Sequence, residues 1–374
     1  MDKGVVLRPA RGVPPGRIIK RELDARGWTQ KDLAAIMERP PKTINGIIRG
    51  YKQITPETAL QLADAFGTSP ELWLNLEANY RLYQARREHQ KSDVARKGYL
   101  YSLAPISEMI KRGWLRATDS IADLEQQFRS FMEISSLDAQ PPLAARFRIS
   151  SAREPETNAQ RVWIQRVKHL AQGQTVSPYD PERLRKALPT LLACASYAED
   201  AAKIPHLLQS LGVYFVIVPH PPHTHLDGAA FKIEGHPVVA LTLRYDRIDN
   251  FWFTLLHELA HIVADHQGFY LDSLDKRDGD ETEHEANQMA TQWLIAREEL
   301  DAFVRSTRPY FSRKKILAFA SRHNRCPGII LGQLHYHYKK DVPSSHLRSL
   351  LVKVKPYFQE RLDTVGPIYR APAP

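Results

Sequence analysis

The sequence contains little cysteine and no long apolar run. Two cysteines, Cys194 and Cys326, stand among 374 residues, too few for a disulfide framework, and neither belongs to a Cys-x-x-Cys pair. No apolar stretch approaches the ~18 residues of a membrane-spanning helix. The N-terminal residues MDKGVVLRPARGVPPG carry positive charge without an apolar segment behind them, unlike a secretory signal. We therefore expect a cytoplasmic protein.

Length and composition predict a multidomain globular chain. Hydrophobic residues make up 43% and charged residues 25%, values that exclude overall disorder, collagen and coiled coil. A single core rarely grows past ~250 residues, so 374 residues predict two or three domains. We expect an all-α N-terminal domain at 1–83, a mainly helical middle region at 84–211, an α+β domain at 212–338 and a tail at 339–374.

Positive charge is concentrated at the N-terminus. Residues 1–52 carry twelve Lys and Arg against five Asp and Glu, a balance of +7, whereas the whole chain carries +10. A basic segment in a chain that is otherwise nearly neutral is typical of a domain that contacts phosphate groups. A solvated basic arm has the same composition.

The basic segment is predicted to fold as short helices. Apolar residues recur at helical spacing in 16–26, 29–37, 42–50, 56–66 and from 70 onward, with Gly, Pro, Ser and Thr between them. Thr29 is an N-cap candidate with Asp32 three residues later, a variant of the capping box. Five brief helices predict a compact helical domain.

The second and third of these helices fit a helix-turn-helix, in which the latter lies in the DNA major groove. Ile44, Ile47 and Ile48 would face the core and leave the polar side chains free. Asn45 could form hydrogen bonds to the edge of a base. Basic side chains, and the free backbone N–H groups at the start of the preceding helix, suit phosphate. The candidate DNA-binding residues are Gln30, Lys42, Thr43, Asn45, Arg49 and Lys52.

Residues 15–79 resemble the helix-turn-helix of HigA-type antitoxins in the XRE repressor family. The similarity rests on GWTQKDLA and on TINGIIRGYKQITPETALQLADAFGTSPELWLNL. It implies sequence-specific operator binding as a homodimer, usually as the autorepressor of a toxin–antitoxin operon.

The C-terminal half combines strand-like segments with a metal-binding pattern. VYFVIVP, AAFKIEG and HPVVALTLRYD are rich in β-branched and aromatic residues, which predicts an antiparallel or mixed sheet. In the helical segment that follows, His257 and His261 are four residues apart and share a helix face, as two Zn²⁺ ligands require. Glu258 is placed to take a proton from an activated water.

A third ligand is expected on the helical stretch 281–295, ETEHEANQMATQWLI. If Ala286, Met289, Ala290 and Trp293 face the core, Glu283 and Glu285 both lie on the margins of that face, and spacing does not separate them. Two histidines and one glutamate with an open position form the thermolysin-type catalytic arrangement.

FWFTLLHELAHIVADH followed by ETEHEANQMATQWLI resembles the ImmA/IrrE family of metallopeptidases. The similarity covers about 212–335 and implies a zincin-like fold, Zn²⁺ as cofactor and Glu258 as the catalytic acid–base. By the family pattern the metal ligands are His257, His261 and Glu285, the Glu of Glu-Ala-Asn. Gln333 departs from the arginine that relatives often carry.

The two resemblances together imply a DNA-binding regulator with a zinc endopeptidase domain. Its expected partners are operator DNA and a protein substrate, either a repressor-type regulator or its own 80–150 segment. The alternative is a non-catalytic antitoxin or repressor whose zincin-like domain senses a signal or binds a toxin. A third possibility is a general peptidase whose helical N-terminus binds protein.

Overall fold

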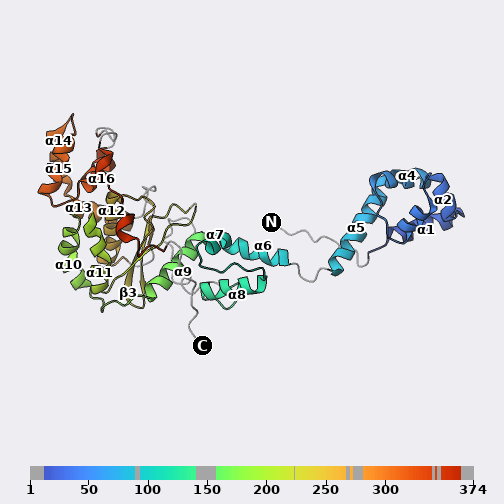
Figure 1. Cartoon of the computed structure of the whole chain (residues 1–374), viewed down its shortest axis with the longest axis horizontal. Helices are drawn as coiled ribbons and strands as arrows, with labels where there is room; N and C mark the ends of the chain where they lie inside the picture. Colours follow the sequence, from blue (N-terminus) through green and yellow to red (C-terminus); the bar gives the residue numbers. More distant parts are fainter. Residues whose placement is uncertain are drawn as a thin grey trace. The chain divides into compact units, whose positions relative to one another are not determined.

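The computed structural model describes residues 12–88, 93–139, 157–222, 224–266, 270–272, 281–338, 342 and 347–363. The chain divides into two compact units, Met1–Ala95 and Arg96–Pro374 (Figure 1). No helix of the described ranges has the length and apolarity to cross a bilayer.

The first unit is the predicted all-α domain. Its helices pack around a core that includes Leu33, Ile44, Leu62 and Trp73. The helices are α1 (Pro15–Arg26), α2 (Gln30–Ile36), α3 (Pro41–Ile48), α4 (Pro56–Phe66) and α5 (Pro70–Glu88).

Local chemistry sets the ends of these helices, as the sequence predicts. The Thr29 hydroxyl accepts from the Asp32 N–H at 3.2 Å, and the Asp32 carboxylate accepts from the Thr29 N–H at 2.7 Å, which completes the capping box of α2. Gly27 and Gly67 take left-handed conformations that end α1 and α4. A Cβ on Gly16 would lie 2.0 Å from the Ile48 carbonyl oxygen, so this glycine permits the close packing of α1 on α3.

The second unit is built on a four-stranded mixed sheet of order β1-β3-β2-β4. Its strands are β1 (Tyr214–Ile217), β2 (Gly228–Ile233), β3 (His236–Leu241) and β4 (Tyr270–Asp272). β1 runs parallel to β3, and β2 is antiparallel to both β3 and β4. The three strands expected from composition are confirmed, and the third ends at Leu241 because Leu243 adopts a φ of 49°.

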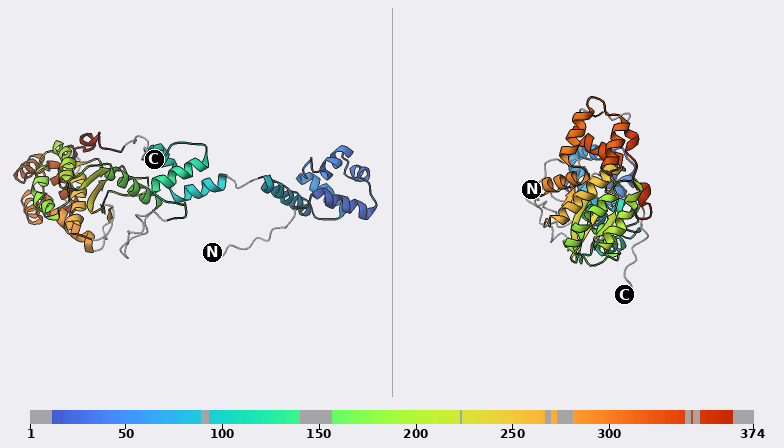
Figure 2. Two further views of the ribbon diagram at one scale, coloured as in Figure 1. Left: turned by 90° about the horizontal axis from the view of Figure 1, so that it is seen from below. Right: turned by 90° about the vertical axis from the view of Figure 1, so that its left-hand side faces the viewer.

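Helices cover both faces of this sheet. Phe215, Ile217 and Val239 point to a core shared with the later helices, whereas their neighbours Val216 and Val238 point to a second core. The second core is completed by four helices from the first part of the expected middle region (Figure 2). They are α6 (Asp93–Leu103), α7 (Ile106–Lys111), α8 (Ile121–Met132) and α9 (Asn158–Gln172). This part of 84–211 packs directly on the sheet.

The core on the other face includes residues of α10 (Pro181–Ala193), η2 (Glu199–Lys203), α11 (Ile204–Ser210), α12 (Ile248–Val263), α13 (Glu281–Leu294) and α16 (Pro327–Tyr338), and α12 and α13 hold the candidate site. α14 (Arg297–Thr307) and α15 (Arg313–Arg322) pack with α16 in a separate apolar cluster. Most of α12 is buried between the sheet and the neighbouring helices (Figure 1).

The described part of the expected tail, 342 and 347–363, belongs to the core. It includes the short helices η3 (Arg348–Leu350) and η4 (Lys355–Phe358), and it buries Val354 and Phe358. The Asp363 N–H donates to the Ile217 carbonyl beside β1 at 3.1 Å. The Asp363 carboxylate accepts from the Arg166 Nη2 at 2.6 Å and from the Trp114 Nε1 at 3.0 Å. This end of the chain therefore ties α9 to the sheet.

Substitution of Asp363 by alanine is expected to lower the free energy of unfolding of the second unit by about 3–5 kcal/mol, because it leaves the buried Arg166 guanidinium without its counter-charge. Chemical denaturation followed by circular dichroism measures the change. Glu182→Gln, which breaks the exposed pair with Arg185, is the control and should cost less than about 1 kcal/mol. Equal effects of both substitutions would refute the structural role of Asp363.

Candidate metal centre and nucleic-acid interface

The helix α12 carries the paired histidines and begins at Ile248. Its N-cap residue is Arg247, with no side-chain cap. Asp249 lies in the first turn and pairs with Arg247, with 3.0 Å between Arg247 Nε and Asp249 Oδ1. A carboxylate in the first turn favours the positive end of the helix dipole.

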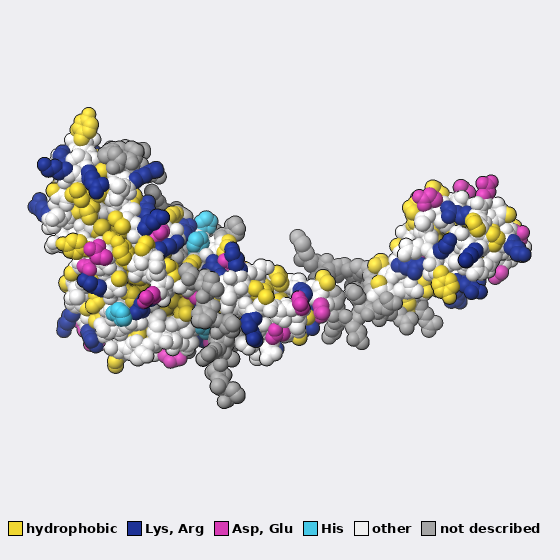
Figure 3. Space-filling view, in the orientation of Figure 1, with side chains coloured by type: hydrophobic (Ala, Val, Ile, Leu, Met, Phe, Trp, Pro, Cys, Tyr) yellow, Lys and Arg dark blue, Asp and Glu magenta, His cyan; other side chains and the backbone are white. Residues whose placement is uncertain are grey.

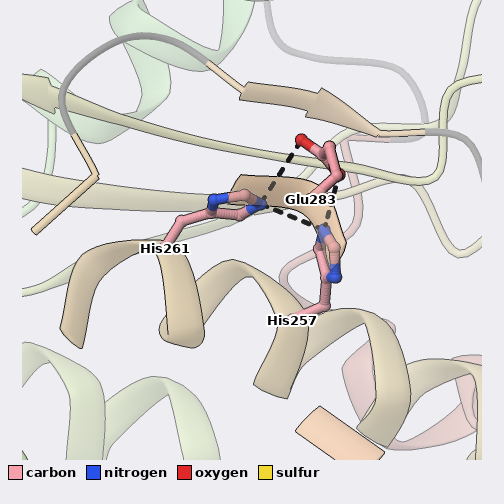
Figure 4. Close-up of side chains that lie close together, drawn as sticks. All are labelled: His257, His261 and Glu283. Carbon is pink, nitrogen blue, oxygen red and sulfur yellow. Dashed lines mark hydrogen bonds and ion pairs between the residues drawn. The ribbon is translucent and has the colours of Figure 1, made fainter. Parts of the chain in front are cut away.

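His257 and His261 lie on one face of α12, and both are buried (Figure 4). Their Nε2 atoms are 3.1 Å apart, and the planes of the rings cross at 81°. The i,i+4 spacing has thus brought two imidazole nitrogens to one point, as the sequence predicts.

Glu283, not Glu285, completes this group. The Glu283 carboxylate lies 3.3 Å from His257 Nε2 and 3.6 Å from His261 Nε2 (Figure 4). His257, His261 and Glu283 are the one group of three or more potential ligands found among the described residues. The structure therefore corrects the assignment of Glu285, taken from the family pattern, by two positions.

The phase of α13 (Glu281–Leu294) explains the correction. Its buried residues are Glu283, Ala286, Ala290 and Leu294, spaced three and four residues apart along one stripe. Glu285 is rotated by about 200° from Glu283 at 3.6 residues per turn, and its side chain is 55% exposed. The sequence-based helix face included Met289 and Trp293, which are only partly buried, and this moved its centre away from Glu283.

Glu285 contacts the site indirectly, through His266, which follows the paired histidines in the chain. Asp265 ends α12 in a left-handed conformation, φ 50°, and the His266 N–H then donates to the His261 carbonyl at 3.0 Å. This turn places His266 Nδ1 3.0 Å from His261 Nδ1, and His266 Nε2 lies 3.1 Å from the Glu285 carboxylate. We call these three residues the His261–His266–Glu285 relay.

The relay matches what a metal-bound histidine requires. If His261 presents Nε2 to an ion, its Nδ1 carries the proton and donates to His266, which in turn donates from Nε2 to Glu285. Asp265, at the turn before His266, accepts from Lys232 Nζ at 2.8 Å.

The geometry of the group fits a tetrahedral divalent ion. Bonds of ~2.0–2.1 Å in a tetrahedral site separate neighbouring ligand atoms by roughly 3.3 Å. The three separations here are 3.1, 3.3 and 3.6 Å. Two imidazole nitrogens and one carboxylate also form the donor set that Zn²⁺ prefers in catalytic sites.

Glu258, the residue after His257, is fully buried and packs against the start of β2. A Cβ on Gly228 would lie 2.2 Å from Glu258 Oε1 and 2.8 Å from the methyl group of Thr254. Only a glycine at that position allows the strand to approach the carboxylate so closely.

Other described histidines contact residues outside this centre. The His220 carbonyl accepts from Arg112, and His225 Nδ1 lies 3.1 Å from Arg244 Nη1. Burial lowers the pKa of His335 on α16, and it lowers the pKa of His337 to about 4, which keeps both rings neutral at physiological pH.

The candidate DNA-binding residues gather around α3 in the first unit. Ile44, Ile47 and Ile48 are buried, as predicted, which leaves the polar side chains at the surface. Lys42, Arg49 and Lys52 are exposed, whereas Gln30, Thr43 and Asn45 are half-buried.

Two hydrogen bonds link these residues, one between α3 and α2 and one between α3 and the segment after it. Asn45 Nδ2 donates to Gln30 Oε1 at 3.2 Å, and Lys52 Nζ donates to Thr43 Oγ1 at 3.3 Å. Tyr51, next to Lys52 in the chain, is 82% exposed.

Two family models match the chain, one in each unit. A helix-turn-helix model matches residues 19–73, and the model of peptidase family M78, described as an IrrE N-terminal-like domain, matches residues 211–323.

Relatives of the first unit are named as a transcriptional regulator and an antitoxin. An HTH-type transcriptional regulator of Escherichia coli, YddM, is 34% identical over 82 residues, which are 22% of this chain and 87% of that protein. Antitoxin HigA-1 of Vibrio cholerae is 35% identical over 82 residues, 22% of this chain and 77% of that protein.

A solved structure of a HigA-family addiction module antidote protein from Coxiella burnetii is 37% identical and covers 21% of this chain and 86% of that one, with a TM-score of 0.20. The chain therefore belongs to the XRE-type helix-turn-helix family with HigA-like antitoxins among its relatives, and it joins to that domain an IrrE N-terminal-like domain of peptidase family M78.

Proposed function

We propose that the chain is a transcriptional regulator that binds operator DNA through its first unit and cleaves protein through a zinc centre in its second. The observation that carries the proposal is the convergence of buried His257, His261 and Glu283 next to Glu258, on the same chain as a helix-turn-helix. The substrate we propose is a repressor-type protein or the chain itself.

His257, His261 and Glu283 would hold the ion, which supplies Lewis-acid activation of a peptide carbonyl and of a water molecule when bound. Glu258 follows His257 directly in α12, and it would accept the proton of the attacking water and pass it to the leaving amine. Burial of this carboxylate strengthens its interaction with neighbouring charge. The His261–His266–Glu285 relay would fix the orientation and tautomer of His261.

At the operator, Asn45 would contact a base edge, with its amide oriented by Gln30, and the exposed cations would contact phosphates. We propose that the operator complex contains a homodimer. Leu60 on α4 and Leu72 on α5 are 54% and 42% exposed, and they provide apolar surface for a second copy.

Glu283→Gln and, separately, His261→Ala are expected to abolish retention of zinc, because each removes one of three ligands. Glu285→Gln should keep one zinc per chain but bind it about 10–100-fold more weakly, because it disturbs only the relay. Metal content of the purified protein and competition with a chelator measure both effects. Loss of zinc in Glu285→Gln with full retention in Glu283→Gln would return the third ligand to Glu285.

Glu258→Gln should retain zinc and slow cleavage at least about 100-fold, since the amide is not a proton acceptor for water. The full chain is incubated with zinc, alone and with the regulator encoded beside it, and fragments are followed by mass spectrometry. Glu182→Gln, an exposed carboxylate on α10, is the matched control. Equal fragment yields from Glu258→Gln and wild type would discard the acid–base role. A wild-type chain that loads zinc but cleaves neither protein would favour the sensor alternative.

Asn45→Ala should reduce discrimination between operator and scrambled DNA by about 1–3 kcal/mol, because a base-edge contact is lost. Lys52→Ala should weaken binding to both duplexes alike and lower the salt slope by about 1, because a phosphate contact carries no sequence information. Fluorescence anisotropy on a duplex selected with the full chain supplies both values. An unchanged specificity ratio in Asn45→Ala would remove this residue from base readout.

A further inference from the structure

The second unit contains a strongly basic segment that the charge of the N-terminus does not explain. Residues 302–340 include nine Lys and Arg and no Asp or Glu. Together with the +7 of residues 1–52, this exceeds the +10 of the whole chain, so the remainder of the chain is net acidic.

Five of these cations surround the loop between α14 and α15. Arg305 lies in the last turn of α14 and Arg308 directly after it, while the other three occupy the first turn of α15. All five are exposed. We call this surface the basic tip, and its cations are Arg305, Arg308, Arg313, Lys314 and Lys315.

The cations of α15 stand where a helix disfavours them. The first turn of a helix presents the positive end of its dipole, and here it carries three positive side chains and no acidic one. Among the described residues, Lys314 and Lys315 have no ion-pair partner. On α14, Asp301 pairs with Arg297, and the Glu299 carboxylate lies 2.9 Å from His323 Nδ1. An external anion would relieve this repulsion.

The tip also has the form of a nucleic-acid contact. Tyr310 is 79% exposed in the middle of the loop, available to stack on a sugar or base. α14, α15 and α16 share their own apolar cluster, which includes Leu300, Ile316 and Leu334. The helices that carry the cations are therefore held together by a packed core. The visible side chains around the tip in Figure 3 are basic, apolar or uncharged, without Asp or Glu.

We propose that the basic tip is a second DNA contact, which binds the phosphate backbone beside the operator site of the first unit. The inference rests on the DNA-binding role proposed above. Once the helix-turn-helix holds the duplex, binding by the tip becomes intramolecular and benefits from a high effective concentration. Because phosphates are common to every sequence, the tip would add affinity and salt dependence without changing specificity.

The test compares the full chain with a variant that carries Arg305→Gln, Lys314→Gln and Lys315→Gln. Anisotropy titrations on the selected duplex at increasing NaCl give the slope of log K against log salt concentration. Each lost phosphate contact should reduce the slope by about 0.9, up to about 2.7 for the triple variant. The ratio of operator to scrambled affinity should stay the same.

Arg183→Gln with Lys186→Gln, two exposed cations of α10, is the matched control and should leave the slope unchanged. If the triple variant fails to fold, Lys314→Gln alone should still lower the slope by about 0.9. A wild-type slope in the folded variant would overturn the inference and leave the proposed operator binding intact.

Two further outcomes would also contradict the proposals. A wild-type chain that binds no selected duplex would refute the proposed DNA-binding function itself. A wild-type slope combined with slower cleavage of an acidic protein substrate would assign the tip to substrate capture and overturn the DNA contact.

Discussion

The burial of four ionisable side chains at one end of a central helix is the constraint on which the second unit depends. His257, Glu258, His261 and Glu283 are each less than a tenth exposed. Removing such groups from water is costly unless they face one another or share a counter-charge. The surrounding fold offsets that cost by packing α13 (Glu281–Leu294) and the turn after α12 near the two histidines. The Glu283 carboxylate then lies at His257, and the His266 imidazole lies at His261.

The sheet makes this arrangement rigid because both of its faces are covered. One face supports α12 and the other is covered by α6 to α9, which explains why the strands carry apolar side chains on both faces of the sheet. The C-terminal segment then ties the two layers together through Asp363 and Arg166. Gly228 on β2 lets the sheet approach Glu258 directly, so the strand and the catalytic candidate form one packed unit.

Two basic surfaces on one chain would, under the proposed function, join DNA binding to proteolysis. The first belongs to a helix-turn-helix with residues suited to read sequence, and the second sits on the helices that follow the metal centre. A peptidase held on DNA by both would meet proteins bound at the same site at a high local concentration. Cleavage of a repressor and occupancy of its operator would then depend on one another.

The sequence by itself determined the features that rest on local periodicity. The i,i+4 pair of His257 and His261, the isoleucine stripe of α3, the Thr29–Asp32 capping box and the three main strands all follow from side chains near one another in the chain. Resemblance of motifs identified both domains, since each motif lies within one short segment.

Only the tertiary structure decided which distant groups meet those segments. The choice of Glu283 over Glu285 depends on which face of α13 contacts α12, and the partly buried Met289 and Trp293 obscured that face. His266 reaches His261 through a left-handed turn at Asp265, and α6 to α9 pack against the far face of the sheet. These contacts join residues far apart in sequence, or depend on a single backbone angle, so no local pattern records them.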